Sequence, residues 1–186
     1  TQTTIARLRE AIEDPEADET RSILRAGTML KVAEIVGATL SGVRAEVDEK
    51  LAAMKQGASA TMIVAGQRRG GAMRMFLIYP EGNFIEATDD TPFLQIGEHK
   101  YGKPILDRVV RPDTSLADAQ KAVLLSMDST LRSNLSVGMP LDLAVIEKDA
   151  FKVGLQRRIE PGDAQFRKMS EAWSNALRES FASIHI

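Results

Sequence analysis

The stretch TMIVAGQRRGGAMRMFLIYPEGNFIEAT, residues 61–88, decides the fold class of this chain. Its apolar residues alternate with a period of two in residues 61–65 and again in residues 73–79. That alternation is typical of strands that bury one face of a sheet. Arg68-Arg69-Gly70-Gly71 separates the two runs and has the composition of a turn. The stretch therefore predicts a β-hairpin.

The second half of the same stretch extends the hairpin into a meander. Pro80-Glu81-Gly82-Asn83 is a second turn sequence, and it leads into a further alternating run at residues 84–88. Residues 93–96 supply one more short apolar run. We expect these runs to form one antiparallel sheet, with the last run as a further strand.

Helical periodicity precedes the sheet. Ile5, Leu8 and Ile12 share one helical face. An acidic run at residues 14–19 contains a proline, cannot continue that helix and predicts an exposed loop. A long amphipathic helix is expected from Met29 onward, with its apolar stripe at Val32, Val36, Leu40, Val43, Val47 and Leu51.

Glycine occurs twice inside this long helix, as Gly37 and Gly42. Each glycine costs about 1 kcal/mol of helix propensity relative to alanine. We therefore expect close packing against a neighbouring segment at both positions.

Helices and one more hairpin follow the sheet. Residues 105–109 have helical spacing, and Ser115-x-x-Asp118 resembles a capping signature that opens a longer helix. Alternation in residues 141–145 and 153–157 predicts a second hairpin. The stripe of the longer helix is expected at Leu116, Val123, Met127 and Leu131. The chain closes with a helix whose stripe is Phe166, Met169, Trp173, Leu177, Phe181 and Ile184.

The order of these elements indicates the fold class. Helices and antiparallel strands come in groups, and single helices do not alternate with single strands. This order favours stacked layers of helix and sheet, an α+β fold, over a doubly wound parallel sheet. With 186 residues and 44% apolar side chains, the chain can bury roughly 70% of its unfolded surface, and we expect residues 1–186 to form one domain.

Composition excludes several function classes. The chain has no cysteine and two histidines, so thiolate nucleophiles, disulfides and most zinc sites are excluded, and no metal or other cofactor is expected. A net charge of −2 gives no long-range field to attract nucleic acid or an anionic membrane. No apolar run is long enough to span a bilayer, and no secretion leader opens the chain, so we expect a cytoplasmic protein.

Two longer motifs add a family resemblance. Residues 93–108, FLQIGEHKYGKPILDR, and residues 128–140, DSTLRSNLSVGMP, are similar to the Anbu family of bacterial proteasome-type peptidases. The resemblance covers essentially the whole chain. It implies a four-layer αββα sandwich of the N-terminal nucleophile hydrolase type, lacking its amino-terminal strands in this chain. It also implies assembly with copies of itself in a ring or spiral, and a peptide or unfolded protein as substrate.

The resemblance implies a threonine peptidase. In the family, the hydroxyl of an N-terminal threonine attacks the peptide carbonyl while its own α-amine acts as the base, which needs no histidine. That threonine opens the first strand, so we expect the nucleophile to lie upstream of this chain. Thr1 is not expected to be the nucleophile, because it runs directly into a helical stripe.

Three residues of this chain are candidates for the shell that supports the threonine. The family's Arg-Asp-x-x-Ser-Gly-Gly stretch, which approaches the threonine amine, matches residues 132–138. Ser136 matches the family serine, whereas Ser133 stands where an aspartate is common. Glu98 stands where the turn Gly-Ser-Gly has its serine, and it could be the displaced carboxylate or a solvated turn residue. Losing the aspartate implies a differently tuned base or weak activity.

The sequence is also compatible with other functions. A scaffold subunit of the same fold without hydrolytic activity is compatible with Ser133. Gly97 to Lys103 has the spacing of a nucleotide-binding loop, but Pro104 has neither a hydroxyl for magnesium nor an amide for phosphate. An RNA contact at the Arg68-Arg69 turn is less favoured than a plain solvated turn. A metal site is also less favoured than ordinary surface acids for Glu147, Asp149, Glu160 and Asp163.

Overall fold

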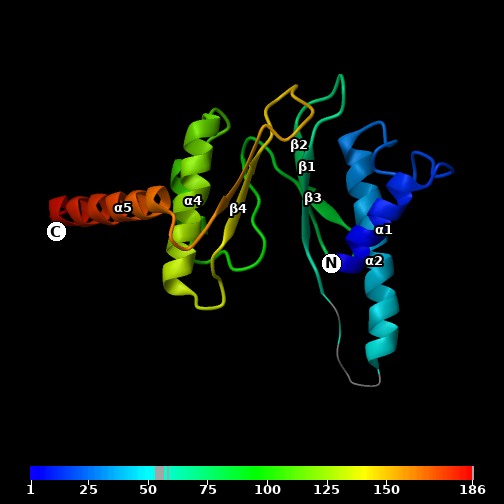
Figure 1. Ribbon diagram of the computed structural model, residues 1–186, viewed down its shortest axis with the longest axis horizontal. Coiled ribbons are helices and arrows are strands. Elements are labelled where there is room, and N and C mark those ends of the chain that lie inside the picture. The colour runs from blue at the N-terminus through cyan, green and yellow to red at the C-terminus, as the bar shows by residue number, and fades with distance from the viewer. Residues whose placement is uncertain (53–56, 58, 186) are drawn as a thin grey trace. The chain divides into compact units, whose positions relative to one another are not determined.

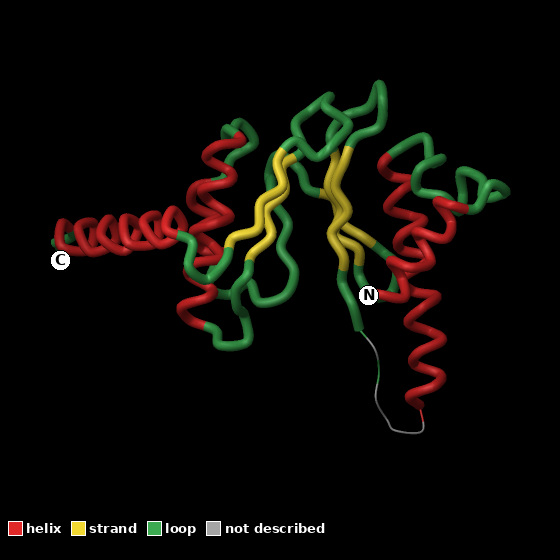
Figure 2. Tube along the Cα trace, viewed as in Figure 1, coloured by secondary structure: helices red, strands yellow, loops and turns green. Residues whose placement is uncertain are grey.

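The computed structural model describes residues 1–52, 57 and 59–185. The chain divides into two compact units. Unit 1 comprises Thr1–Ile96 and Glu147–Phe151, and unit 2 comprises Gly97–Ile146 and Lys152–Ile186. Each unit combines α-helices with an antiparallel sheet (Figure 2), which confirms the α+β class. The expectation of one domain remains a prediction.

Unit 1 pairs two helices with a meander (Figure 1). The strands lie in the order β1-β2-β3, and all of them are antiparallel, as the alternating pattern predicts. Helix α2 packs on β2, and α1 packs on α2. The elements are α1 (Gln2–Glu13), α2 (Met29–Leu51), β1 (Met62–Gly66), β2 (Arg74–Ile78) and β3 (Phe84–Glu86).

The core of unit 1 forms between α2 and the sheet. Phe76 and Ile78 of β2 are almost completely buried, and they belong to one cluster with the apolar stripe of α2. Fully burying side chains of this size contributes about 1.5–3 kcal/mol each, so this contact fixes the helix on the sheet. The stripe of α2 is confirmed at Val32, Val36, Leu40 and Val43.

Gly37 marks the closest approach of α2 to the second turn. A Cβ atom at Gly37 would lie 2.2 Å from the carbonyl oxygen of Gly82, a distance that no real side chain tolerates. Gly82 has φ of +91°, which favours glycine in this turn. The packing predicted for Gly37 is therefore confirmed. The same prediction for Gly42 is wrong, because a Cβ there would meet nothing within 4 Å.

The loop after α1 is fixed to unit 1 more firmly than its acidic sequence predicts. The guanidinium of Arg25 donates hydrogen bonds to the carbonyl oxygens of Asp14, Pro15 and Ala17. Ala17 is completely buried. The expectation of an exposed loop is wrong at this residue, because a distant arginine holds the backbone of the loop.

The meander ends earlier than the sequence predicts. Beyond β3, the Ala87 amide donates one more hydrogen bond to the Met75 carbonyl oxygen, and Thr88 and Thr91 then form an isolated bridge. Residues 93–96 form no strand, so that prediction is wrong. Pro92 precedes them and has no amide hydrogen to donate to a neighbouring strand.

Unit 2 contains the remaining elements, and its sheet is the predicted second hairpin. The strands β4 and β5 pair antiparallel with Leu143 opposite Arg157. The side chain of Asp163 caps α5 by accepting from the Phe166 amide, and Ser115 caps α4 by accepting from the Asp118 amide. The elements are α3 (Lys103–Val109), α4 (Leu116–Ser133), β4 (Leu141–Val145), β5 (Leu155–Ile159) and α5 (Ala164–Ser183).

The buried face of α4 differs from the predicted stripe. Leu116 and Val123 are exposed to 49% and 39%, so the predicted stripe is wrong there. The buried face includes Ser126, because a Cβ at Gly102 would lie 2.2 Å from the Ser126 hydroxyl. The start of α3 thus comes close to α4 at Ser126 and Thr130, where the side chains are small. The buried residues of α4 are Ala122, Leu125, Ser126, Asp128 and Thr130.

The last helix, α5, is only half buried. Phe166, Met169 and Trp173 are partly covered, which agrees with the contact between α4 and the beginning of α5. Leu177, Phe181 and the following Ile184 are exposed to 50%, 80% and 71%. Figure 1 shows α5 leading away from α4 toward the C-terminus. The predicted stripe therefore exists, but its second half has no cover within unit 2.

Candidate functional site

The candidate site lies in unit 2, where α4 ends. Ser133 is the last residue of α4, and Asn134 leaves the helical conformation with φ of −135° and ψ of 110°. The side-chain oxygen of Asn134 then accepts a hydrogen bond of 2.8 Å from the Ser136 amide. This local turn stops the helix and fixes the backbone of Ser136.

Glu98 reaches the same place from the segment before α3. Gly97 has φ of +78°, which allows the sharp turn that presents Glu98. One carboxylate oxygen of Glu98 accepts from the Lys100 amide at 3.1 Å, and the other accepts from the Asn134 side-chain amide at 3.0 Å. Asn134 therefore joins Glu98 to Ser136 in one hydrogen-bonded network.

Only two of the three predicted residues, Glu98 and Ser136, take part in the network. It contains Glu98, which is half-buried, and the backbone of Ser136, whose side chain is exposed. Ser133 is exposed, and within the described residues its hydroxyl makes no hydrogen bond. Asn134, which links the others, is not among the residues that the sequence singles out. The spacing Asn134-x-Ser136 is typical of an Asx turn and could have indicated it.

A buried carboxylate lies five residues before Ser133 in α4. The side chain of Asp128 is 6% exposed and accepts from the Arg132 guanidinium at 3.2 Å. Arg132 also donates to the Ser170 hydroxyl of α5 at 2.6 Å. The i, i+4 spacing of Asp128 and Arg132 is the signal in the sequence for this pair. The pair fixes the last turns of α4, which carry Ser133.

The chemistry available to the network follows from its donors and acceptors. A carboxylate has about four acceptor positions, and the two hydrogen bonds to Glu98 leave others open for a cation such as an ammonium group. Ser133 and Ser136 add hydroxyl groups at the end of the same helix. The arrangement can therefore bind and orient a protonated amine. None of these side chains is a nucleophile with an adjacent base.

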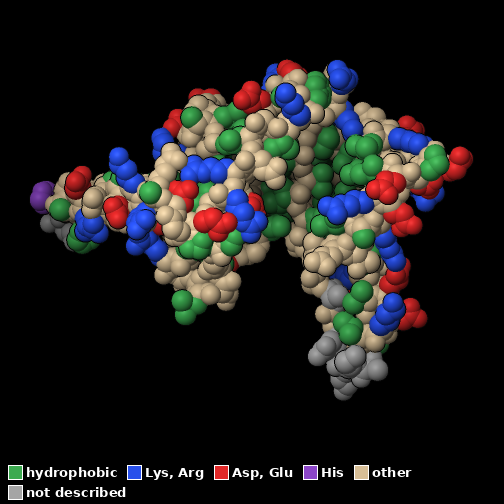
Figure 3. All heavy atoms as spheres, viewed as in Figure 1, with side chains coloured by type: hydrophobic (Ala, Val, Ile, Leu, Met, Phe, Trp, Pro, Cys, Tyr) green, Lys and Arg blue, Asp and Glu red, His purple; other side chains and the backbone are tan. Residues whose placement is uncertain are grey.

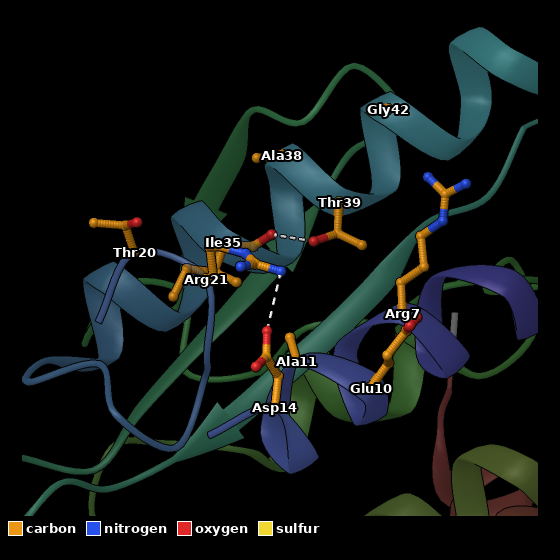
Figure 4. A pocket seen from close by; sticks show the side chains of 10 residues that line it. All are labelled: Arg7, Glu10, Ala11, Asp14, Thr20, Arg21, Ile35, Ala38, Thr39 and Gly42. Atoms are coloured by element: carbon orange, nitrogen blue, oxygen red, sulfur yellow. Dashed lines mark hydrogen bonds and ion pairs between the residues drawn. The ribbon is translucent and has the colours of Figure 1, made fainter. Parts of the chain in front are cut away.

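A separate groove lies between α1 and α2 in unit 1. It has a volume of about 540 Å³ and is lined by both helices and by the loop between them (Figure 4). Its charges are largely paired: Arg7 binds Glu46 through two hydrogen bonds of 2.8 and 2.6 Å, and Arg21 lies 3.4 Å from Asp14. Glu10 also lines the groove, and no histidine, lysine or second unpaired carboxylate stands beside it among the described lining residues.

The alternative motifs have structural roles. Lys103 binds Asp107 at 2.6 Å, and Gly102 is needed for the contact with α4. No strand precedes this segment directly, so it lacks the strand-loop-helix setting of a phosphate-binding loop. Among the described residues, no three His, Asp or Glu side chains are placed to share a metal ion.

Three of the four acids considered for a metal have other partners. Asp163 caps α5 and binds Arg157 at 2.7 Å. The hydrogen bond from the Phe166 amide and the nearby guanidinium lower the pKa of Asp163. Glu160 lies 3.4 Å from Arg158, and Asp149 binds Gln67.

Solved structures give the decisive comparison. An Anbu (Gly-1) mutant from Hyphomicrobium sp. strain MC1 is 48% identical to this chain, with a TM-score of 0.89 over 100% of this chain and 75% of that one. The chain belongs to the Anbu family. Anbu from Yersinia bercovieri, described as an ancestral β-subunit, is 39% identical, with a TM-score of 0.90 over 99% of this chain and 74% of that one.

A third Anbu structure shows an assembly. The helical assembly of the Anbu complex from Pseudomonas aeruginosa contains a chain that is 40% identical, with a TM-score of 0.91 over 100% of this chain and 75% of that one. The fold of this Anbu chain is therefore the expected α+β, proteasome-like fold. The chain matches no protein-family model and none of the curated proteins.

Proposed function

We propose that this Anbu chain is part of a threonine-type peptidase subunit that hydrolyses peptide bonds in peptides or unfolded proteins. The nucleophile is an N-terminal threonine upstream of Thr1. Support comes from the 48% identity over the whole chain with a solved Anbu protein, and from a relative described as an ancestral β-subunit.

The proposed chemistry fits the composition of the chain. The threonine hydroxyl attacks the peptide carbonyl, and the α-amine of the same residue takes up the proton. An α-amine has a pKa of about 8, so it is a usable base at neutral pH without a histidine. Neither cysteine nor a histidine in the candidate network is needed for this reaction.

The observation that carries the proposal is the network of Glu98, Asn134 and Ser136. The family resemblance implies that an aspartate, common at the position of Ser133, approaches the threonine amine. Here Glu98 is held at the same helix end by Asn134 and keeps free acceptor positions. We assign to Glu98 the role of that carboxylate, which stabilises the ammonium form of the threonine amine and sets its pKa.

Thr1 itself does not fit the role of nucleophile. Its carbonyl oxygen accepts from the Ile5 amide at 3.0 Å, so Thr1 is the first residue of a helical turn. The family resemblance implies that the nucleophile is the first residue of a strand, whereas Thr1 leads into a helix.

The experiment is an assay of the full-length Anbu protein with fluorogenic peptides and an inhibitor directed at N-terminal threonine. We expect peptide cleavage, loss of cleavage after treatment, and a mass increase on the upstream threonine. Replacing that threonine by alanine should abolish both cleavage and labelling. A full-length protein that neither cleaves nor becomes labelled would favour a scaffold without hydrolytic activity, with which Ser133 in place of the aspartate is compatible.

Self-association into a ring or spiral is part of the proposal. A relative forms a helical assembly. The exposed part of the α5 stripe gives this chain an apolar surface that is available for self-association. Its residues Leu177, Phe181 and Ile184 lie at spacings of four and three residues, which places them on one face. We propose that copies of the chain cover this face.

The proposed setting is cytoplasmic, without a cofactor, nucleic acid or membrane. Every helix within the described residues is too short or too polar to cross a lipid bilayer. The net charge of −2 supports the exclusion of nucleic acid as a partner.

A further inference from the structure

A small basic pocket lies at the tip of the β1–β2 hairpin in unit 1, apart from the residues proposed for catalysis. It has a volume of about 270 Å³, and its walls are the hairpin turn and the start of α2. Lys and Arg side chains stand at this end of the hairpin (Figure 3). The lining residues are Gly27, Thr28, Met29, Arg68, Arg69, Gly70, Gly71, Ala72 and Arg74.

The charge of the pocket is uncompensated. Arg74 binds Glu86 through hydrogen bonds of 2.5 and 2.6 Å, so its charge is neutralised. Arg68 and Arg69 have no carboxylate within ion-pair distance among the described residues, and no residue that lines the pocket is acidic. The pocket therefore presents two free guanidinium groups.

Arg68 has an unsatisfied donor in this pocket. Its Nε is covered by protein, but it has no hydrogen-bond partner within the described part of the chain. A covered donor without a partner is uncommon in folded proteins. Arg68 itself lines the pocket, and a guanidinium group prefers an oxyanion that it can bind with two parallel hydrogen bonds.

The surroundings hold Arg69 and the hairpin turn in place. The guanidinium of Arg69 lies 5.1 Å from the ring centroid of Phe151, at a distance typical of cation–π contacts. The neighbouring Asp149 is docked on the hairpin by two hydrogen bonds of 2.7 Å with the Gln67 side chain. Gln67 also binds the Gly71 carbonyl at 2.9 Å, which fixes the turn.

The start of α2 adds partial positive charge. Thr28 caps the helix by accepting from the Lys31 amide at 3.1 Å. The amides of the first turn of a helix that remain without an intrahelical partner carry positive potential, which favours phosphate. Met29 and Thr28 bring this helix end to the pocket wall.

We propose that this pocket binds a small phosphate-type dianion. Two free guanidinium groups match two negative charges, whereas a single carboxylate would leave one of them unpaired. The volume suits a phosphate group, and the net charge of −2 of the whole chain disfavours a long nucleic acid as its carrier.

The test is a calorimetric titration of the full chain with inorganic phosphate, in a phosphate-free buffer of low ionic strength, because salt screens such contacts. We expect saturable binding. Arg68→Met and Arg69→Met should each weaken it about tenfold, and Arg68→Lys should weaken it less, because lysine keeps the charge but not the planar fork. Acetate and succinate at matched ionic strength should bind more weakly than phosphate.

Arg9→Met is the matched control. Arg9 is an exposed arginine on α1 in the same unit, and its removal changes the net charge by the same amount. We expect unchanged phosphate binding in this variant. No saturable phosphate binding, equal weakening by Arg9→Met, or tighter binding of succinate would overturn the proposal. Thermal unfolding shows whether each variant is folded. If Arg68→Met does not fold, Arg69→Met provides the test.

Discussion

The Asn134 side-chain amide donates a hydrogen bond of 3.0 Å to the Glu98 carboxylate, although 36 residues separate the two in the sequence. The same Asn134 side chain accepts from the Ser136 amide. An asparagine can serve both neighbours because its amide carries a donor and an acceptor. The candidate network depends on both of these hydrogen bonds of Asn134.

Replacing Glu98 by glutamine should shift the pH dependence of peptide hydrolysis by the full-length protein. A carboxylate near the threonine amine stabilises the ammonium form and raises its pKa, so removing the charge lowers that pKa. The neutral amine is then available at lower pH, and the acid limb of kcat/KM should move to lower pH. Glu171→Gln on the exposed surface of α5 is the control. An acid limb that stays in place would exclude Glu98 from this role.

Adding an aspartate at Ser133 should reverse that shift. The double variant Glu98→Gln, Ser133→Asp places a carboxylate at the position where the family resemblance has one. Its acid limb should return toward that of the unchanged protein, because the ammonium form regains a negative neighbour. The measurement is again kcat/KM against pH. If the double variant behaves like Glu98→Gln alone, the two positions do not act on the same amine.

The two glycines of α2 should respond to alanine in opposite directions. Gly37→Ala should destabilise unit 1 by about 2 kcal/mol, because its Cβ collides with the Gly82 carbonyl oxygen. Gly42→Ala should stabilise it by about 1 kcal/mol, since alanine is the better helix former and nothing lies within 4 Å. Urea unfolding followed by circular dichroism measures both. Equal effects of the two substitutions would contradict the close contact at Gly82.

Acid should weaken the ion pair of Arg74 and Glu86. The hydrogen bond from Arg74, and the charge of its guanidinium, lower the pKa of Glu86 below its ordinary value of 4.5. The pair therefore contributes stability above that ordinary value, and the contribution is lost as the pH falls through the lowered pKa. Glu86→Gln should cost about 1 kcal/mol at pH 7, because both side chains are about one third exposed.

Urea unfolding at neutral and strongly acidic pH tests this expectation. The difference between Glu86→Gln and the unchanged protein should disappear once Glu86 is protonated in both the folded and the unfolded state. Glu171→Gln should show no difference at either pH. A constant difference across the pH range would show that the charge of Glu86 does not contribute.

A charge on the exposed face of α5 should prevent self-association. Phe181→Glu places a carboxylate on a side chain that is 80% exposed, so it leaves the core of unit 2 unchanged. Association that buries this face would leave that charge desolvated and unpaired, which is costly. Sedimentation velocity should show smaller species than for the unchanged protein. Arg178→Ala on the same helix is the control, and assemblies of equal size in both variants would place the contact elsewhere.

Local patterns predicted much of the fold. The hairpin of β1 and β2 follows from alternation and from the Gly70-Gly71 turn, because the side-chain period of a strand is set by its backbone geometry. The stripe of α2 follows from helical geometry in the same way. The prediction of a strand at residues 93–96 was wrong because a run of four residues with three apolar side chains does not specify a pairing partner.

The site was predicted in part. The motif comparison singled out Glu98, Ser133 and Ser136, but periodicity gives no sign that Glu98 meets Asn134. Periodicity also gave no sign that Ser126 and Thr130 on the buried face of α4 pack against Gly102 of another segment. Contacts between distant segments depend on the packing of whole elements, which local patterns do not contain.

The amino-acid sequence by itself determined most of the element types, the grouping of helices and antiparallel strands, and the Anbu motifs, since these depend on local geometry and residue identity. Only the tertiary structure decided which residues became partners. It joined Asn134 to Glu98 and brought Gly37 against Gly82, and within the described part of the chain it gave Arg68 and Arg69 no carboxylate partner at the hairpin tip. The physical reason is that hydrogen bonds and close packing act over a few ångströms in space, whatever the separation along the chain.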